Sequence, residues 1–113
     1  NHIVPYGLGD WCPPGKIDCP IPLSSTAFHY LDASIVAKAA AVLGNAEDSA
    51  RYADLRDRIG RAFVAEFYDG KNKTFGSQTA DAMALDLGLV PVGDEHAVYF
   101  RSRADRTGSV AIR

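Results

Sequence analysis

Two long helical patterns separated by only two residues constrain the fold of this chain more than any other feature. Over residues 26–43, apolar side chains recur at steps of three and four positions, and residues 46–68 repeat that period. Gly44 and Asn45 stand between the patterns, a glycine suited to end one helix and an asparagine suited to cap the next. A connection this short forces the two helices to fold back as an antiparallel hairpin.

The apolar positions of each pattern predict which side of each helix faces the core. The first helix is expected to use Ser24 or Ser25 as its N-cap, and its inward positions are Phe28, Leu31, Ile35, Ala39, Val42 and Leu43. The inward positions of the second helix are Tyr52, Leu55, Ile59, Ala62, Phe63 and Phe67. The charged residues between these positions predict a solvated face and not a binding patch.

The remaining sequence continues the helical pattern. A third helix is predicted over residues 77–87, with Gly88 ending it. A fourth is predicted from Asp94, and clear periodicity is lost beyond Arg101. The inward positions expected for this fourth helix are Ala97, Val98 and Phe100. Since no run of alternating residues indicates a sheet, the sequence predicts an all-α fold of antiparallel helical hairpins.

A turn-rich segment, residues 1–23, precedes the first helix and is predicted to be an irregular loop. Prolines and glycines interrupt it too often for a helix to persist. They are Pro5, Gly7, Gly9, Pro13, Pro14, Gly15, Pro20 and Pro22. A long loop in a compact chain is usually functional or a linker. The apolar residues Tyr6, Trp11 and Ile17 argue against a flexible linker.

Composition excludes several classes of partner. With 113 residues, 47% of them hydrophobic, the chain can bury one core and is expected to form a single domain. The formal charge of −2 gives no reason to expect a nucleic acid or an anionic membrane as partner. No apolar run approaches the ~20 residues needed to cross a bilayer. A soluble protein is expected, and its compartment, cytoplasmic or exported, stays open.

Two cysteines, Cys12 and Cys19, flank a Pro-Pro-Gly turn with six residues between them. They can close a small disulfide ring in an oxidising compartment or remain reduced in the cytosol, and both alternatives stay open. The spacing is not a zinc pattern, because no second Cys/His pair follows at ligand distance. Since His2, His29 and His96 are also scattered, we expect neither a metal site nor a cofactor.

Asp10 and Trp11 form the most chemically suggestive pair in the loop, between Gly9 and two prolines. A carboxylate can hold a sugar hydroxyl, and an indole face can stack on the C–H face of a sugar. The alternative is structural, with Trp11 filling the edge of the core and Asp10 capping a turn.

Six segments together resemble a family of enzymes, the bacterial α-L-rhamnosidases. They are residues 6–11 (YGLGDW), 25–30 (STAFHY), 42–44 (VLG), 48–67, 76–80 (GSQTA) and 87–91 (LGLVP). Each motif is short, and the specificity comes from the ordered set, which extends over residues 6–92. Beyond Gly93 the resemblance fades.

The resemblance implies a toroid of paired antiparallel helices, an (α/α)₆ barrel, with the active site at the end where loops gather. It also implies inverting hydrolysis of terminal α-L-rhamnosides, for which an acid and a base stand about 6.5–9.5 Å apart. The family's Glu-Arg-x-Gly-Trp acid segment does not occur here, and its base lies beyond the matched region. Glu47, Glu66 and Glu95 have the pattern of ordinary helix-surface residues. We therefore expect residues 1–113 to be a fragment of a larger catalytic domain and inactive alone.

The resemblance implies that this chain forms part of the sugar-binding pocket. The expected partner is a rhamnose-containing glycoside or polysaccharide. The substrate-binding candidates are Asp10, Trp11, His29, Tyr30 and Gln78. No residue of this chain is assigned a catalytic role. Within the expected domain, residues 1–23 form the loop, 24–68 the hairpin and 75–104 the further helices.

Two other hypotheses belong to a different class. A helical-repeat binding module uses similar helix pairs, but no second copy of the pattern follows about 34 residues away, and such modules need three or more repeats. A self-assembling chain is the other alternative, because a few helices taken from a toroid expose an apolar face that favours a homo-oligomer.

Overall fold

The computed structural model describes residues 1–9 and 18–111, with side chains up to Arg103. Its helices are α1 (Ile21–Val42), α2 (Ala46–Phe67), α3 (Gln78–Leu87) and α4 (Glu95–Ala111). Among these described residues, the only β-pairing is one isolated bridge between Asp69 and Thr74. The predicted all-α class is confirmed. None of the helices in the described part is long and apolar enough to cross a membrane.

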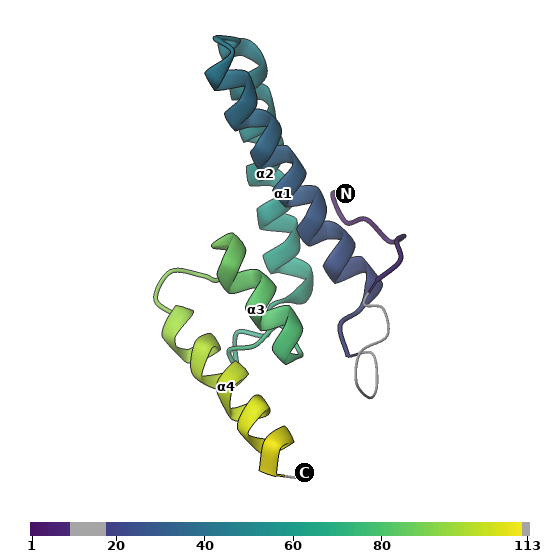
Figure 1. Cartoon of the computed structure of the whole chain (residues 1–113), viewed down its shortest axis with the longest axis vertical. Coiled ribbons are helices and arrows are strands. Elements are labelled where there is room, and N and C mark those ends of the chain that lie inside the picture. Colours follow the sequence, from purple (N-terminus) through teal and green to yellow (C-terminus); the bar gives the residue numbers. More distant parts are fainter. Residues whose placement is uncertain (10–17, 112–113) are drawn as a thin grey trace.

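The α1–α2 hairpin is the longest feature of the molecule, and α3 and α4 lie beside one end of it (Figure 1). We call residues 21–33 and 57–67 the lower half of the hairpin, and residues 34–42 and 46–56 its upper half. The molecule measures 52 × 32 × 25 Å, so it is clearly elongated.

The turn between α1 and α2 has the predicted chemistry. Gly44 adopts a left-handed φ of +77°, and the Asn45 side chain accepts a hydrogen bond from the backbone N–H of Asp48 at 3.0 Å. The Asn45 amide donates in return to the Asp48 carboxylate at 2.7 Å. This reciprocal cap lets α2 begin at Ala46, directly after Asn45.

Helix α1 begins earlier than the sequence predicts, at Ile21 and not near Thr26. Pro20 is the N-cap and Pro22 lies in the first turn. A proline is tolerated there because the first turn leaves its backbone N–H groups without helical partners. Ser24 is therefore not a cap, and its hydroxyl donates to the Ile21 carbonyl at 3.2 Å.

The predicted inward face of α1 is wrong. Phe28, Ile35 and Val42 are 58%, 54% and 87% exposed. The residues of α1 that are buried are Leu23, Thr26, Ala27, Ala33, Ala37 and Ala40. Most of these side chains are small, so α2 can approach α1 closely on this side. Apolar periodicity does not show whether a helix packs through its small or its large apolar residues, and the prediction chose the large ones. On α2 the predicted Ile59 and Phe63 are fully buried.

The principal core lies where the lower half of the hairpin meets α3 and α4. Phe63 is its centre, with ring centroids 5.2 Å from Phe67 and 5.5 Å from Phe75. Its other buried members are Cys19, Leu23, Ala27, Ala80, Ala84, Leu89, Val90 and Val98. The core joins all four helices, so the position of each loop at this end depends on it.

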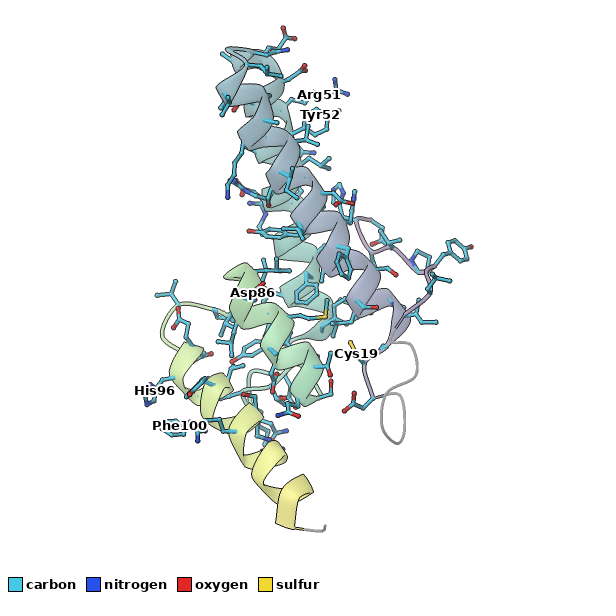
Figure 2. The ribbon with its side chains drawn as sticks, viewed as in Figure 1. Cys19, Arg51, Tyr52, Asp86, His96 and Phe100 are labelled. Atoms are coloured by element: carbon cyan, nitrogen blue, oxygen red, sulfur yellow. The ribbon has the colours of Figure 1, made fainter. Side chains whose placement is uncertain are left out.

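Helix α4 confirms one of its three expected inward residues. Val98 is fully buried, whereas Ala97 and Phe100 are exposed. Figure 2 shows His96 and Phe100 on the outer side of α4, where their ring centroids are 4.6 Å apart. The helix continues to Ala111, well past the point at which the sequence loses clear periodicity.

Candidate functional site

The lead-in loop packs on the beginning of α1. The backbone N–H of Val4 donates to the Thr26 hydroxyl at 3.0 Å. Gly9 has a φ of +70°, and a Cβ there would lie 2.7 Å from Ile21. A side chain at this position would therefore meet both backbone strain and a collision. Residues 4–9 thus follow the first turns of α1. Asp10 and Trp11 lie outside the described part, and their sugar-binding roles stay predictions.

A buried carboxylate organises the neighbouring loop between α2 and α3. Asp81 is fully buried and accepts hydrogen bonds from the Thr74 hydroxyl, at 3.1 and 2.9 Å to its two oxygens. The backbone N–H of Phe75 also donates to it. The Thr74 hydroxyl oxygen accepts from the Gly76 backbone N–H at 3.1 Å. These bonds hold the loop against the first turn of α3.

Asp81 was not among the residues singled out from the sequence. A signal was present, because Asp81 stands between alanines in the first turn of a helix whose neighbours Ala80 and Ala84 face the core. A carboxylate at an apolar-facing position needs partners. The sequence could not name those partners, since Thr74 belongs to a turn seven residues away.

Gln78 opens α3, but Ser77 is the residue that caps it. The Ser77 hydroxyl accepts from the Ala80 backbone N–H at 3.1 Å. The Gln78 amide donates instead to the Ser102 carbonyl of α4 at 3.3 Å. Its side chain therefore connects two helices, and its role in substrate binding stays a prediction.

Tyr30 lies at a different level from Gln78. It lines a hollow of 540 Å³ together with Gly60 of α2 and Leu89, which follows the C-terminal end of α3. Gln78 begins α3, and Leu89 follows its other end, about 13.5 Å away along the helix axis. The structure therefore does not bring Tyr30 and Gln78 together. His29, half-buried, precedes Tyr30 on α1.

The hollow beside Tyr30 owes its shape to a glycine. A Cβ at Gly60 would lie 3.1 Å from both Tyr30 and Leu89, so the tyrosine ring packs directly over the backbone of α2. The rim carries Asp57 and Arg61, and Asp57 is already paired with Arg56 at 2.9 Å. The walls are predominantly aliphatic, which indicates a packing surface more than a polar ligand site.

A tyrosine–carboxylate–lysine group connects the end of α2 to the start of α4. The Tyr68 hydroxyl donates to Asp94 at 2.8 Å, and the Lys73 ammonium contacts the same oxygen at 3.2 Å. Burial, followed by the bond to Asp94, raises the pKa of Tyr68 to about 12. The hydrogen bond from Tyr68, followed by that from Lys73, lowers the pKa of Asp94. Both shifts favour the neutral phenol beside the ionised carboxylate.

Glu47 and Glu66 lie far apart on one helix, and Glu95 makes a local hydrogen bond. Glu47 is in the first turn of α2 and Glu66 near its end, so about 28 Å of helix separates them. Glu95 begins α4, and its carboxylate accepts the Gly93 backbone N–H at 2.9 Å. Across residues 1–9 and 18–103, no group of three His, Cys, Asp or Glu side chains could hold a metal ion. Cys19 is buried, and Cys12 lies outside the described residues, so their pairing stays untested.

The described residues form one long antiparallel helical hairpin, α1–α2, followed by a second pair of helices, α3 and α4. Residues 2–110 match the family described as the bacterial alpha-L-rhamnosidase 6 hairpin glycosidase domain. The chain belongs to this family, as the ordered motifs predict.

Two curated relatives agree with this assignment. An α-L-rhamnosidase of Formosa agariphila is 32% identical over 104 residues, which cover 80% of this chain and 11% of the relative. An α-L-rhamnosidase of Alteromonas sp. is 34% identical over 96 residues, which cover 74% and 10%. The chain therefore spans about a tenth of the length of the curated relatives it matches. No solved structure matches it significantly.

Proposed function

We propose that these residues form part of the catalytic domain of a glycoside hydrolase that removes terminal α-L-rhamnosyl groups with inversion. The match of residues 2–110 to the six-hairpin glycosidase family carries the proposal. Both relatives named above are α-L-rhamnosidases, which makes a rhamnose-containing glycoside or polysaccharide the expected substrate.

Within such a domain, we assign this chain two tasks, to build the scaffold and to contribute to the sugar pocket. The lead-in to Asp10 packs on α1 at Ile21, at the same end of the hairpin as the loop held by Asp81. In this proposal, the Asp10 carboxylate accepts a hydroxyl of the sugar and Trp11 stacks on its C–H face. Gln78 adds a polar group at that end, whereas His29 and Tyr30 contribute farther up α1.

The catalytic acid and base are proposed to come from outside these 113 residues. An inverting hydrolase needs two carboxyl groups about 6.5–9.5 Å apart, and Glu47 and Glu66 are separated by several times that distance along α2. The chain alone is therefore expected to be inactive, and a longer protein that contains it is expected to be active.

An assay with an aryl α-L-rhamnoside tests the proposal. The longer protein should release the aglycone, and proton NMR of the first-formed sugar should show the inverted anomer. Residues 1–113 alone should give no turnover above the background reaction. Turnover by the purified chain would contradict the assignment of the acid and base, and an inactive longer protein would contradict the proposed function.

A substitution in the longer protein tests the role of Asp10. Asp10→Asn should lower kcat/KM by about 10- to 100-fold, since a hydrogen bond to a charged group contributes about 1.5–3 kcal/mol. Asp18→Asn is the matched control, because Asp18 is an exposed carboxylate that precedes the same helix. Equal kinetics for the two variants would remove Asp10 from the pocket.

A further inference from the structure

Asp81 is the one charged residue that is buried among residues 1–9 and 18–103. Burying a carboxylate is costly, and an apolar side chain of similar volume often serves stability equally well. A buried polar group can instead fix one conformation of the chain around it. The residues that Asp81 holds therefore indicate its role.

Asp81 holds the segment that joins α2 to α3. Both of its oxygens accept from the Thr74 hydroxyl, and one also accepts from the Phe75 backbone N–H. The Thr74 oxygen accepts in turn from the N–H of Gly76, whose φ of +106° favours glycine. The backbone N–H of Asp81 donates to the Ser77 carbonyl at 2.9 Å. Four consecutive residues are thus connected to Asp81, directly or through one further bond.

The same segment packs into the core at the start of α1. Phe75 belongs to the core cluster that contains Cys19 and Leu23, and Figure 2 shows Cys19 at the lower end of the hairpin. Since α1 begins, α2 ends and α3 begins at this end, the described residues before α1 and those before α3 lie close to one another (Figure 1). In the proposed function, this is the end at which Asp10 and Trp11 contribute to the sugar pocket.

Gln78 is the residue through which the segment can reach a sugar. It directly follows Ser77 and its side chain is half-buried. Its amide nitrogen donates to the Ser102 carbonyl at 3.3 Å, so the orientation of the amide is set. Within the described residues, the amide oxygen of Gln78 accepts no hydrogen bond. An amide oxygen of this kind can accept a sugar hydroxyl.

We propose that Asp81 is a positioning residue of the sugar pocket, which holds the α2–α3 segment so that the amide oxygen of Gln78 accepts a hydroxyl of the substrate. The inference rests on the proposed function and deepens it, because Asp81 acts on the sugar without touching it. An asparagine in its place keeps one acceptor oxygen and loses the charge, so it holds Thr74 and Phe75 less firmly.

Steady-state kinetics of the longer protein on an aryl α-L-rhamnoside test the inference. Asp81→Asn should raise KM by about 10-fold, the loss expected for roughly one hydrogen bond to the sugar, and should leave kcat nearly unchanged. Ala37→Leu is the control matched for stability, because it crowds the contact of α1 with α2 in the upper half of the hairpin. A smaller folded fraction lowers the measured kcat and leaves KM unchanged, so the control should keep the wild-type KM.

A second pair of variants leaves the carboxylate in place and tests the inference even if Asp81→Asn does not fold. Thr74→Val removes the hydroxyl that Asp81 holds and should raise KM in the same way, whereas Thr74→Ser keeps a hydroxyl and should retain the wild-type KM. Gln78→Ala should also raise KM, and adding Asp81→Asn to it should change KM little further, since both act through one contact.

The outcomes separate this inference from the proposed function. In an active longer protein, a wild-type KM for Asp81→Asn, or equal KM values for Thr74→Val and Thr74→Ser, would overturn the positioning role and leave the proposed function in place. A longer protein that hydrolyses no α-L-rhamnoside would overturn the proposed function, and the inference with it.

Discussion

The two halves of the α1–α2 hairpin are built on different principles. In the lower half, Phe63 and Leu23 are fully buried and contribute to a core shared with α3 and α4. In the upper half, the buried residues of α1 are Ala37 and Ala40. The tip of the hairpin has a shallow hollow of 400 Å³. Small residues line it: Ala41, Gly44, Ala46, Ser49, Ala50 and Ala53.

The difference teaches that one pair of helices can depend on two sources of stability. The lower half gains from burying large apolar side chains, at about 25 cal/mol per Å². The upper half buries little area inside this chain, so it depends on close backbone approach and on the Asn45 cap. Its large apolar residues, Ile35 and Val42, point away from α2 and stabilise it only when something covers them.

Phe63→Ala should cause the largest loss and should affect the lower half. Removing a fully buried ring costs about 3–5 kcal/mol, and here Phe67 and Phe75 lose their aromatic partner as well. Urea unfolding followed by circular dichroism measures the effect. Val42→Ala, in the upper half, is the control and should change the free energy of unfolding of the monomer by less than about 0.5 kcal/mol. Similar losses from both variants would contradict the comparison.

Asp81→Asn should destabilise the lower half by about 2 kcal/mol, because hydrogen bonds to a charged acceptor contribute about 1.5–3 kcal/mol. The bonds at risk come from the Thr74 hydroxyl and the Phe75 backbone. The measurement is again the midpoint of urea unfolding. Asp86→Asn, an exposed carboxylate on the same helix, should be neutral. If the two variants are equally stable, Asp81 does not hold the loop.

Ala37→Leu should destabilise the upper half by about 1–3 kcal/mol, because a larger side chain does not fit the close contact with α2. Ala39→Leu provides the matched control two positions away, on the exposed side of α1. That variant should leave the fold intact, with a thermal midpoint close to that of the wild type. A wild-type midpoint for Ala37→Leu would show that α2 does not pack closely on this face.

Tyr68→Phe should have the smallest effect, and a change in pH dependence should identify it most clearly. Folding raises the pKa of Tyr68 from 10.0 to about 12, so the stability that the neutral phenol contributes is present below pH 10 and lost between pH 10 and 12. The thermal midpoint of the variant should therefore fall less than that of the wild type between pH 10 and 12. Tyr6→Phe, at an exposed tyrosine, should keep the wild-type profile.

The lowered pKa of Asp94 predicts a loss of stability in the opposite direction, as the pH falls. Its contribution is present above its ordinary value of 3.8 and is lost as the pH falls through the lower value of the folded protein. Tyr68→Phe should therefore also be less sensitive to acid than the wild type. Identical acid and alkaline profiles for the variant and the wild type would show that the Tyr68–Asp94 bond contributes nothing measurable.

Local signals in the sequence were sufficient to predict the helices and the turn. Gly44 and Asn45 act through their own backbone and side chain, so their roles follow from residue type. The start of α1 was predicted too late because Pro20 and Pro22 were taken as part of an irregular loop. Prolines are also common at the beginning of a helix, where these two lie. The inward face of α1 was missed because it depends on which neighbour each side of the helix meets, and that is set by the rest of the fold.

The candidate site was less predictable than the helices. The match to the family confirms the recognition made from the ordered motifs. The roles of Asp10 and Trp11 stay predictions, since both lie outside the described residues. The buried bonds of Asp81 join positions that approach each other only after α2, its turn and α3 have formed. Such partners depend on tertiary structure, and short-range patterns do not identify them.

The two-residue turn at Gly44 and Asn45 also has a consequence for the order of folding. Closing a loop this short costs little chain entropy, and contacts between near neighbours in sequence form fastest. The tip of the hairpin, which buries the least, is therefore expected to assemble first, and the zipping of α1 against α2 then brings the aromatic residues of the lower half together. In this chain the part that contributes least to the final stability sets the register for the part that contributes most.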